Sequence, residues 1–522
     1  MERMGKFMLF HGVVVGGRHK LEELLLEAHG RFLYCANMKI VFTSSETVPF
    51  ASTGGLGDVA AALPEELARQ GVDMIRMMPL YEEIDRKKCG IEKCGIELHI
   101  PLGHAWYFGT VWMQQSGGVT TYFIHSEEFF ERHGIYGHGG HGYADNFERF
   151  LFFQKAVVKL IDEWDLQPDV VHCNDWQTAL IPMLLHYGIG GRFRNGKEKT
   201  LFTIHNLAHQ GWAPAEKFYM TQLPESCYTM QTLEFYGEIN TLKGGLVGAT
   251  AINAVSPAYA KEIQTSRFGC KLEGVLRERS TALHGILNGI DYSRWNPETD
   301  PDIPAHYSAA DLSGKMECKR ALQEAMGFKA DPKVPLLGII TRLVPQKGID
   351  LLVEAIEQIL GTGTQLVILG TGDARYEQAC REWAERWPDQ VCSWIEFSHE
   401  KAHQIEAGID LFLMPSEFEP CGQNQLYSMR YGTIPLVHGV GGLEDSVIDY
   451  DEKGGTGFKF HDYTTEAFLH CLERALGVFQ NGARWKPLLK RAMKQDFSVR
   501  HMANDYISLY EEIIEPQGDL EE

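Results

Sequence analysis

The sequence predicts an α/β protein with two doubly wound domains that face each other across a cleft. Two observations predict it. Short, fully apolar runs alternate with amphipathic helical stretches from Met38 onward, and this series breaks once, near residues 288–297. Apolar strands followed by helices are typical of parallel sheets that are covered on both faces. The clearest expected strands are residues 38–43, 169–173, 201–205, 336–340, 365–370, 411–414 and 434–437.

Residues 1–37 carry mixed charges and contain no clear strand. They include several acidic residues, which is unlike an organelle transit peptide. We therefore expect an N-terminal extension that need not belong to the fold.

Composition excludes several classes of protein. The chain has 522 residues and a net charge of -21, and nucleic-acid binding relies on clustered Lys and Arg, so a nucleic-acid partner is not expected. No apolar run approaches the roughly 18 residues of a membrane span, and no secretory signal is evident. The sequence therefore predicts a cytoplasmic protein without a membrane partner.

The cysteines and histidines do not indicate a metal site. The 11 cysteines are mostly single, without Cys-x-x-Cys pairs, and are interpreted as reduced thiols. Cys89 and Cys94 have no second ligand pair, and His133, His138 and His141 lie in a Gly-rich loop without helical i, i+4 spacing. Neither a metal nor a cofactor is predicted.

The most informative segment is residues 415–430, where a strand end is followed by Glu419, a Pro-Cys-Gly turn and a predicted helix from about Asn424. A helix start presents free N–H groups to an anion, so Cys421, Gly422, Gln423 and Asn424 are candidate phosphate-binding residues beside the carboxylate. Taken alone, a Glu at such a position is more often only a helix cap.

A Gly-rich loop joins the first strand to a helix predicted over 58–70. It contains Ser52, Gly54, Gly55 and Asp58. Glycines let the backbone approach a ligand closely, although such a turn is often only structural.

In the second domain, Arg342 and Lys347 follow a buried strand and precede a helix. Cations are unfavourable at a helix start, so an anionic ligand explains them better than surface solvation. An arginine can bind phosphate oxygens through two parallel hydrogen bonds.

These segments, in order, resemble the signatures of bacterial glycogen synthases and plant starch synthases, and the resemblance covers residues 38 to about 515. The Gly-rich loop matches the family's Lys-Thr-Gly-Gly-Leu-Gly-Asp except that Ser52 stands where the family has Lys. Residues 143–146 and 172–177 resemble the segments that place Asp145 and Asn174 at the glucose site, and Phe397 falls where the family has an aromatic ring against adenine.

The resemblance implies a GT-B glycosyltransferase with two Rossmann-like domains. It implies an N-terminal starch synthase domain on the acceptor side (38–287), a C-terminal nucleotide-sugar domain (288–496), and a helix in 497–522 that crosses back to the N-terminal domain. The implied reaction is retaining transfer of glucose from ADP-glucose to the 4-hydroxyl at the non-reducing end of an α-1,4-glucan.

The family also implies roles for the residues. Arg342 and Lys347 stabilise the departing diphosphate, Glu419 supports the positive charge that develops on the sugar, and Asp145 and Asn174 hold the opposite face of the sugar. Two alternatives remain open: a related enzyme that uses UDP-glucose, and a glucan-binding protein impaired in catalysis, because Ser52 lacks the family's charge.

Overall fold

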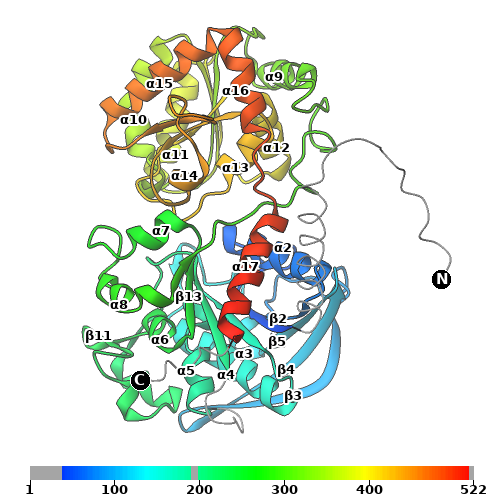
Figure 1. Ribbon diagram of the computed structural model, residues 1–522, viewed down its shortest axis with the longest axis vertical. Coiled ribbons are helices and arrows are strands. Elements are labelled where there is room, and N and C mark those ends of the chain that lie inside the picture. The colour runs from blue at the N-terminus through cyan, green and yellow to red at the C-terminus, as the bar shows by residue number, and fades with distance from the viewer. Residues whose placement is uncertain (1–37, 190–197, 516–522) are drawn as a thin grey trace, which may run out of the picture.

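The computed structural model describes residues 38–189 and 198–515, so the prediction for residues 1–37 lies outside the described part of the chain. Two lobes are stacked along the long axis of the molecule, each built on its own sheet (Figure 1). The predicted α/β class with two doubly wound lobes is confirmed.

The N-terminal lobe contains a nine-stranded sheet in the order β14-β13-β9-β8-β1-β2-β5-β4-β3. Neighbouring strands from β14 to β5 pair in parallel. The strands are β1 (Lys39–Thr43), β2 (Asp73–Pro79), β3 (Glu92–Leu102), β4 (Ala105–Ser116), β5 (Val119–His125), β8 (Val170–Asn174), β9 (Lys199–Ile204), β13 (Ala251–Ala254) and β14 (Leu283–Gly285).

Strands β3 and β4 form an antiparallel extension of this sheet that the sequence did not reveal. Buried and more exposed positions alternate along β3, and Trp106 and Phe108 on β4 are exposed. A strand covered on one face shows such alternation, whereas the search for fully apolar runs finds only strands buried on both faces.

Helices and short strands complete the N-terminal lobe. The helices are α2 (Gly55–Arg69), α3 (Glu127–Phe130), α4 (Asn146–Glu163), α5 (Ile181–His186), α6 (Thr241–Gly248), α7 (Pro257–Glu262) and α8 (Glu273–Glu278). The short strands are β6 (Gly137–His138), β7 (His141–Gly142), β10 (Trp212–Pro214), β11 (Glu234–Phe235) and β12 (Glu238–Asn240).

The C-terminal lobe contains a six-stranded parallel sheet in the order β17-β16-β15-β18-β19-β20. Its strands are β15 (Leu336–Ile340), β16 (Gln365–Leu369), β17 (Val391–Trp394), β18 (Leu411–Met414), β19 (Ile434–His438) and β20 (Phe458–Phe460). Its helices are α9 (Ser313–Ala325), α10 (Ile349–Gly361), α11 (Ala374–Arg386), α12 (His399–Gly408), α13 (Asn424–Arg430), α14 (Gly441–Ser446), α15 (Thr465–Phe479) and α16 (Gly482–Ala492).

The last described helix, α17 (Val499–Ile514), leaves the C-terminal lobe and packs on the N-terminal lobe beside α2 (Figure 1). Its buried Tyr510 hydroxyl lies 2.7 Å from Nδ1 of His172 on β8. The hydroxyl of Tyr506 accepts a 2.9 Å hydrogen bond from the Asn253 side chain on β13. The chain therefore crosses between the lobes twice, once before β15 and once before α17.

No helix in the described ranges 38–189 and 198–515 is long and apolar enough to cross a membrane.

Candidate active site

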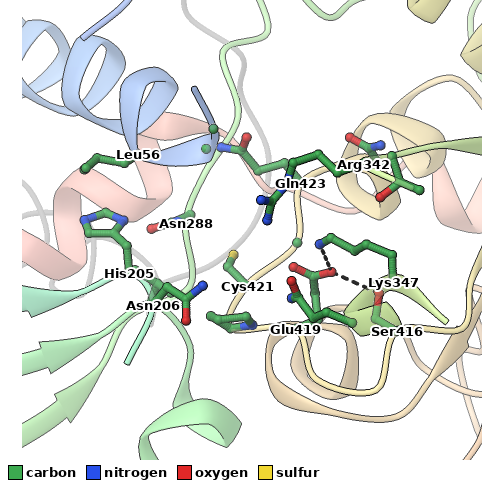
Figure 2. Close-up of a pocket in the computed structure, with 18 of the residues that line it drawn as sticks. Leu56, His205, Asn206, Asn288, Arg342, Lys347, Ser416, Glu419, Cys421 and Gln423 are labelled. Atoms are coloured by element: carbon green, nitrogen blue, oxygen red, sulfur yellow. Dashed lines mark hydrogen bonds and ion pairs between the residues drawn. The ribbon is translucent and has the colours of Figure 1, made fainter. Parts of the chain in front are cut away.

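A cleft of about 610 Å³ lies between the two lobes, at the carboxyl ends of strands from both sheets. Ligands of doubly wound proteins bind at these strand ends. Its lining includes Glu46 after β1, Asp175 after β8, His205 at the end of β9, Arg342 after β15 and Ser416 after β18. The close-up shows side chains from both lobes converging on this space (Figure 2).

Glu419 and Lys347 form an ion pair on the C-terminal side of the cleft. Lys347 Nζ lies 2.6 Å from Glu419 Oε2, and Ser416 Oγ donates a 3.1 Å hydrogen bond to the same oxygen (Figure 2). Glu419 is only 6% exposed. Because both partners bind Oε2, the other carboxylate oxygen has no side-chain partner among the described residues.

Arg342 lies at the same wall of the cleft, and its side chain makes no hydrogen bond or ion pair with residues in the described ranges. Its charge nevertheless affects the pKa of a residue on the other side of the cleft. Burial, and then the nearby Arg342 guanidinium, lower the pKa of His209 on the N-terminal lobe. Arg342 and Lys347 thus provide two cations in one cavity, one unpaired and one paired.

A carboxylate that the sequence analysis did not single out holds the Gly-rich loop. The side chain of Glu46 accepts hydrogen bonds from the Thr53 backbone N–H, from Thr53 Oγ1 at 2.8 Å and from the Tyr136 hydroxyl. Glu46 is buried and lines the cleft. Its position directly after the first strand, at the ligand-binding edge of a parallel sheet, is the signal that could have identified it.

The Gly-rich loop meets the opposite lobe at Gln423. Helix α2 begins at Gly55, earlier than the predicted start at Asp58. A Cβ atom on Gly55 would lie 3.3 Å from Gln423 Oε1, so the absence of a side chain there lets the two lobes approach closely. Both residues line the cleft.

Asp175 sits at the end of β8 in an unusual backbone conformation, with φ 55° and ψ -178°. Strained non-glycine conformations of this kind concentrate at functional sites. Asp175 Oδ1 accepts the backbone N–H groups of His205 at 2.7 Å and Asn206 at 3.3 Å. Burial raises the pKa of Asp175 to about 7.

Asn174 lies outside the cleft lining and contacts His205, whose backbone binds Asp175. Its Nδ2 donates to the Thr43 carbonyl at 3.0 Å, and its Oδ1 lies 2.9 Å from His205 Nε2. Burial lowers the pKa of His205 to about 3, so the neutral ring donates to the amide oxygen. Asn174 therefore orients His205, which itself lines the cleft.

Many of the residues predicted from the sequence come together in the cleft. Those that line it are Gly54, Gly55, Arg342, Lys347, Glu419, Cys421, Gly422, Gln423 and Asn424. Those that do not line it are Ser52, Asp58, Asp145, Asn174 and Phe397.

Asp145 is the N-cap residue of α4 and forms a double ion-pair contact with Arg132. Both N–O distances are 2.7 Å. Burial opposes ionisation, but the Arg132 guanidinium holds the pKa of Asp145 below its usual value. Arg132 is half-buried and lies in the loop after α3. No local motif in the sequence predicts that it pairs with Asp145.

The remaining predicted residues, Ser52, Asp58 and Phe397, lie outside the cleft lining. Ser52 is exposed, and its Oγ donates to the Gly54 carbonyl at 3.1 Å. Asp58 on α2 lies 3.5 Å from Arg294 of the opposite lobe, and burial raises its pKa against the effect of that cation. Phe397 is 81% exposed.

One group of possible metal ligands occurs in the described part of the chain, away from the cleft lining. Asp300, Asp302 and His403 bring their ligand atoms together, but Asp300 Oδ2 already accepts the Tyr431 hydroxyl and lies 2.7 Å from His403 Nδ1. These contacts satisfy the buried carboxylate without an ion.

Two facing doubly wound lobes, with a cleft at the strand ends of both sheets, are the architecture of the GT-B glycosyltransferases. Family models agree with this class. Residues 39–278 match the starch synthase catalytic domain, and residues 324–477 match glycosyl transferases group 1.

Similar proteins narrow the class to one family. The chain is 44% identical over 478 residues to a glycogen synthase of Anaeromyxobacter dehalogenans (strain 2CP-1), covering 91% of this chain and 98% of the relative. It is 45% identical over 481 residues to a glycogen synthase of Anaeromyxobacter sp. (strain Fw109-5), covering 92% and 100%. The chain therefore belongs to the glycogen synthase and starch synthase family, and it is a glycosyltransferase.

A solved structure agrees with this assignment. The catalytic domain of starch synthase IV from Arabidopsis thaliana, bound to ADP and acarbose, superposes with a TM-score of 0.84 at 32% identity, covering 91% of this chain and 99% of that one. A sucrose-phosphate synthase from Thermosynechococcus elongatus, with a TM-score of 0.56 at 17% identity, shares the fold alone.

Proposed function

We propose that this glycosyltransferase transfers glucose from ADP-glucose to the non-reducing end of an α-1,4-glucan, with retention of configuration. The observation that carries the proposal is the meeting of Arg342, Lys347 and the buried Glu419 in one cleft between the lobes. The Arabidopsis relative was solved with ADP and acarbose, a ligand pair consistent with a nucleotide donor and a glucan acceptor.

The charges of the cleft suit departure of a diphosphate. Arg342 has no competing partner among the described residues, so its guanidinium is available to bind two phosphate oxygens. Lys347, at the end of the short 3₁₀ turn Pro345–Lys347, supplies a second cation. Cations placed in advance where negative charge develops lower the barrier, because they need no reorganisation during the reaction.

Glu419 faces the sugar in this proposal. Lys347 and Ser416 hold Oε2, and this fixes the carboxylate so that Oε1 can stabilise positive charge on the glucose ring. Asp145 and Asn174 act on the opposite face of the sugar as positioning residues, Asn174 through its bond to His205.

The rest of the site is proposed to bind the nucleotide sugar. Gly54, Gly55 and the 421–424 turn bring backbone close to the ligand. Ser52, Asp58 and the exposed Phe397 lie outside the cleft lining, and closure of the lobes on a nucleotide engages them. We also propose that residues 38–287 bind the acceptor, that residues 288–496 bind the donor, and that residues 497–522 tie the two together.

Release of ADP from ADP-glucose, measured with and without glycogen and beside UDP-glucose, tests the proposal. Glycogen-dependent ADP release that exceeds UDP release supports it. Faster release of UDP would assign the UDP-glucose alternative. Glycogen binding without release of either nucleotide would assign a glucan-binding protein that has lost catalysis.

A further inference from the structure

The two lobes touch directly behind the turn that carries Glu419. Helix α7 of the N-terminal lobe faces α14 of the C-terminal lobe at this point (Figure 1). Two carboxylates cross between the lobes in opposite directions. Asp445 Oδ2 on α14 accepts the backbone N–H of Ala258 on α7 at 2.7 Å, and Glu262 Oε1 on α7 accepts the backbone N–H of Gly441 on α14 at 2.8 Å.

A third contact reaches the catalytic turn itself. Ser256 Oγ, from the N-terminal lobe, donates a buried 2.8 Å hydrogen bond to the Pro420 carbonyl. The same hydroxyl accepts the Tyr259 N–H and caps α7. One side chain therefore fixes both the start of α7 and the residue that follows Glu419.

The start of α14 is tied to the same turn. The Gly442 N–H donates to the carbonyls of Glu419 at 3.1 Å and Pro420 at 3.2 Å. A Cβ atom on Gly441 would lie 2.0 Å from the Glu419 carbonyl oxygen, so the two backbones are in direct contact. The start of α14 and the 419–420 turn therefore form one packed unit, so the contacts that α7 makes with α14 bear on the backbone of Glu419.

We propose that Ser256, Glu262 and Asp445 form an inter-lobe clasp that positions Glu419 when the lobes come together. Closing the cleft and completing the active site are then one event. The three are positioning residues, since they act through the 419–420 backbone and not on the substrate. The link to catalysis rests on the proposed function, whereas the link between the clasp and the Glu419 backbone does not.

Ser256 is buried, whereas the exposure of the two clasp carboxylates suits contacts that break and reform. Asp445 is exposed and Glu262 half-buried, so water replaces their hydrogen bonds at low cost when the cleft opens. The clasp thus sets the geometry of the closed state without locking it, as release of product requires.

The test compares the Glu262→Ala/Asp445→Ala variant with wild type. Amide hydrogen exchange of a peptide covering residues 415–423 should rise at least about threefold, because the turn loses its support from the opposite lobe. Glucosyl transfer should lose about tenfold in kcat, with the KM for ADP-glucose changed less than about twofold, since the donor site itself is intact.

Two sets of control variants distinguish a clasp from general destabilisation. Glu262→Gln/Asp445→Asn retains the accepting oxygens and should keep most of the wild-type rate. Glu278→Ala/Glu452→Ala removes one exposed carboxylate from each lobe outside the clasp and should change neither exchange nor rate.

If the 415–423 peptide of the Glu262→Ala/Asp445→Ala variant exchanges its amide hydrogens as slowly as in the wild type, the proposal is overturned, whatever the variant's rate of glucosyl transfer. Loss of rate in the Gln/Asn variant equal to that in the alanine variant would also overturn it. If the wild type itself transfers no glucose, the proposed function fails, and the exchange measurement still decides whether the clasp holds the turn.

Discussion

Lys347 and Glu419 are 72 positions apart in the chain, yet Nζ of one lies 2.6 Å from Oε2 of the other. The pair joins the segments that follow β15 and β18, which are neighbouring parallel strands. Neighbouring strand ends thus place a cation and a carboxylate in contact at the bottom of the cleft.

Replacing Glu419 by Gln removes the negative charge and keeps the size of the side chain. We expect kcat to fall by about 10²- to 10³-fold, because a charge aimed at the transition state is lost, while ADP binding measured by calorimetry stays near wild type. A variant that retains kcat within about tenfold would contradict a central electrostatic role for Glu419.

Arg342 allows activity to be separated from stability. Since it has no partner among the described residues, Arg342→Ala should leave the Tm within about 1 °C of wild type. The same change should lower kcat/KM for the donor by about 30-fold or more, and Arg342→Lys should recover only part of this, because a lysine cannot bind two phosphate oxygens in parallel. A parallel loss of Tm and activity would assign Arg342 a structural role.

The exposed Ser52 leaves room for a longer side chain. Ser52→Lys should raise kcat/KM for ADP-glucose by about tenfold, because it adds a cation at the rim of a diphosphate site. Ser52→Gln is the control of similar length without charge. Equal kinetics for Ser52→Lys and Ser52→Gln would show that charge at this position does not matter here.

The buried Asp175 should make stability depend on pH. Its pKa in the folded protein is about 7, above the value of about 3.8 in the unfolded chain, so the native state holds a proton that the unfolded state releases. Its contribution to stability is complete below pH of about 4 and is lost as pH rises through about 7, at up to about 1.4 kcal/mol per pH unit.

Asp175→Asn does not titrate and retains an acceptor for the His205 N–H. The Tm of the variant minus the Tm of wild type should therefore increase from pH 5 to 7 and stay constant above that. Thermal unfolding measured across this pH range checks the prediction. If Tm depends on pH in the same way in the two proteins, the raised pKa of Asp175 is ruled out.

Docking of α17 can be tested through its buried tyrosines. Tyr510→Phe removes the hydroxyl that lies 2.7 Å from His172 Nδ1 and leaves a buried ring nitrogen without that partner. The free energy of unfolding should fall by about 1 to 3 kcal/mol. Tyr219→Phe, at an exposed position, is the matched control and should change little. Equal denaturation midpoints for the two variants would count against the contact.

The local sequence was sufficient for many of the parallel strands and for several segments that line the cleft. Apolar runs marked the strands because strands covered on both faces need apolar side chains throughout, and β8, β9, β15, β16, β18 and β19 lie where predicted. Arg342, Lys347, Glu419 and the turn after it were predicted as site residues because they lie in the loops that follow two such strands, β15 and β18. The hairpin of β3 and β4 was missed because its pattern alternates.

What only the tertiary structure decided is which side chains share the cleft. Glu46 binds Thr53 in the Gly-rich loop, Asn174 contacts His205, and Asp145 pairs with Arg132. Apart from Glu46 and Thr53, the two partners of each contact do not lie in one short motif. The clasp between α7 and α14 joins residues from different lobes. Strand ends and turns follow from near neighbours in the chain, whereas these contacts depend on how two sheets twist, face each other and are tied together by α17, which is a property of the packed molecule.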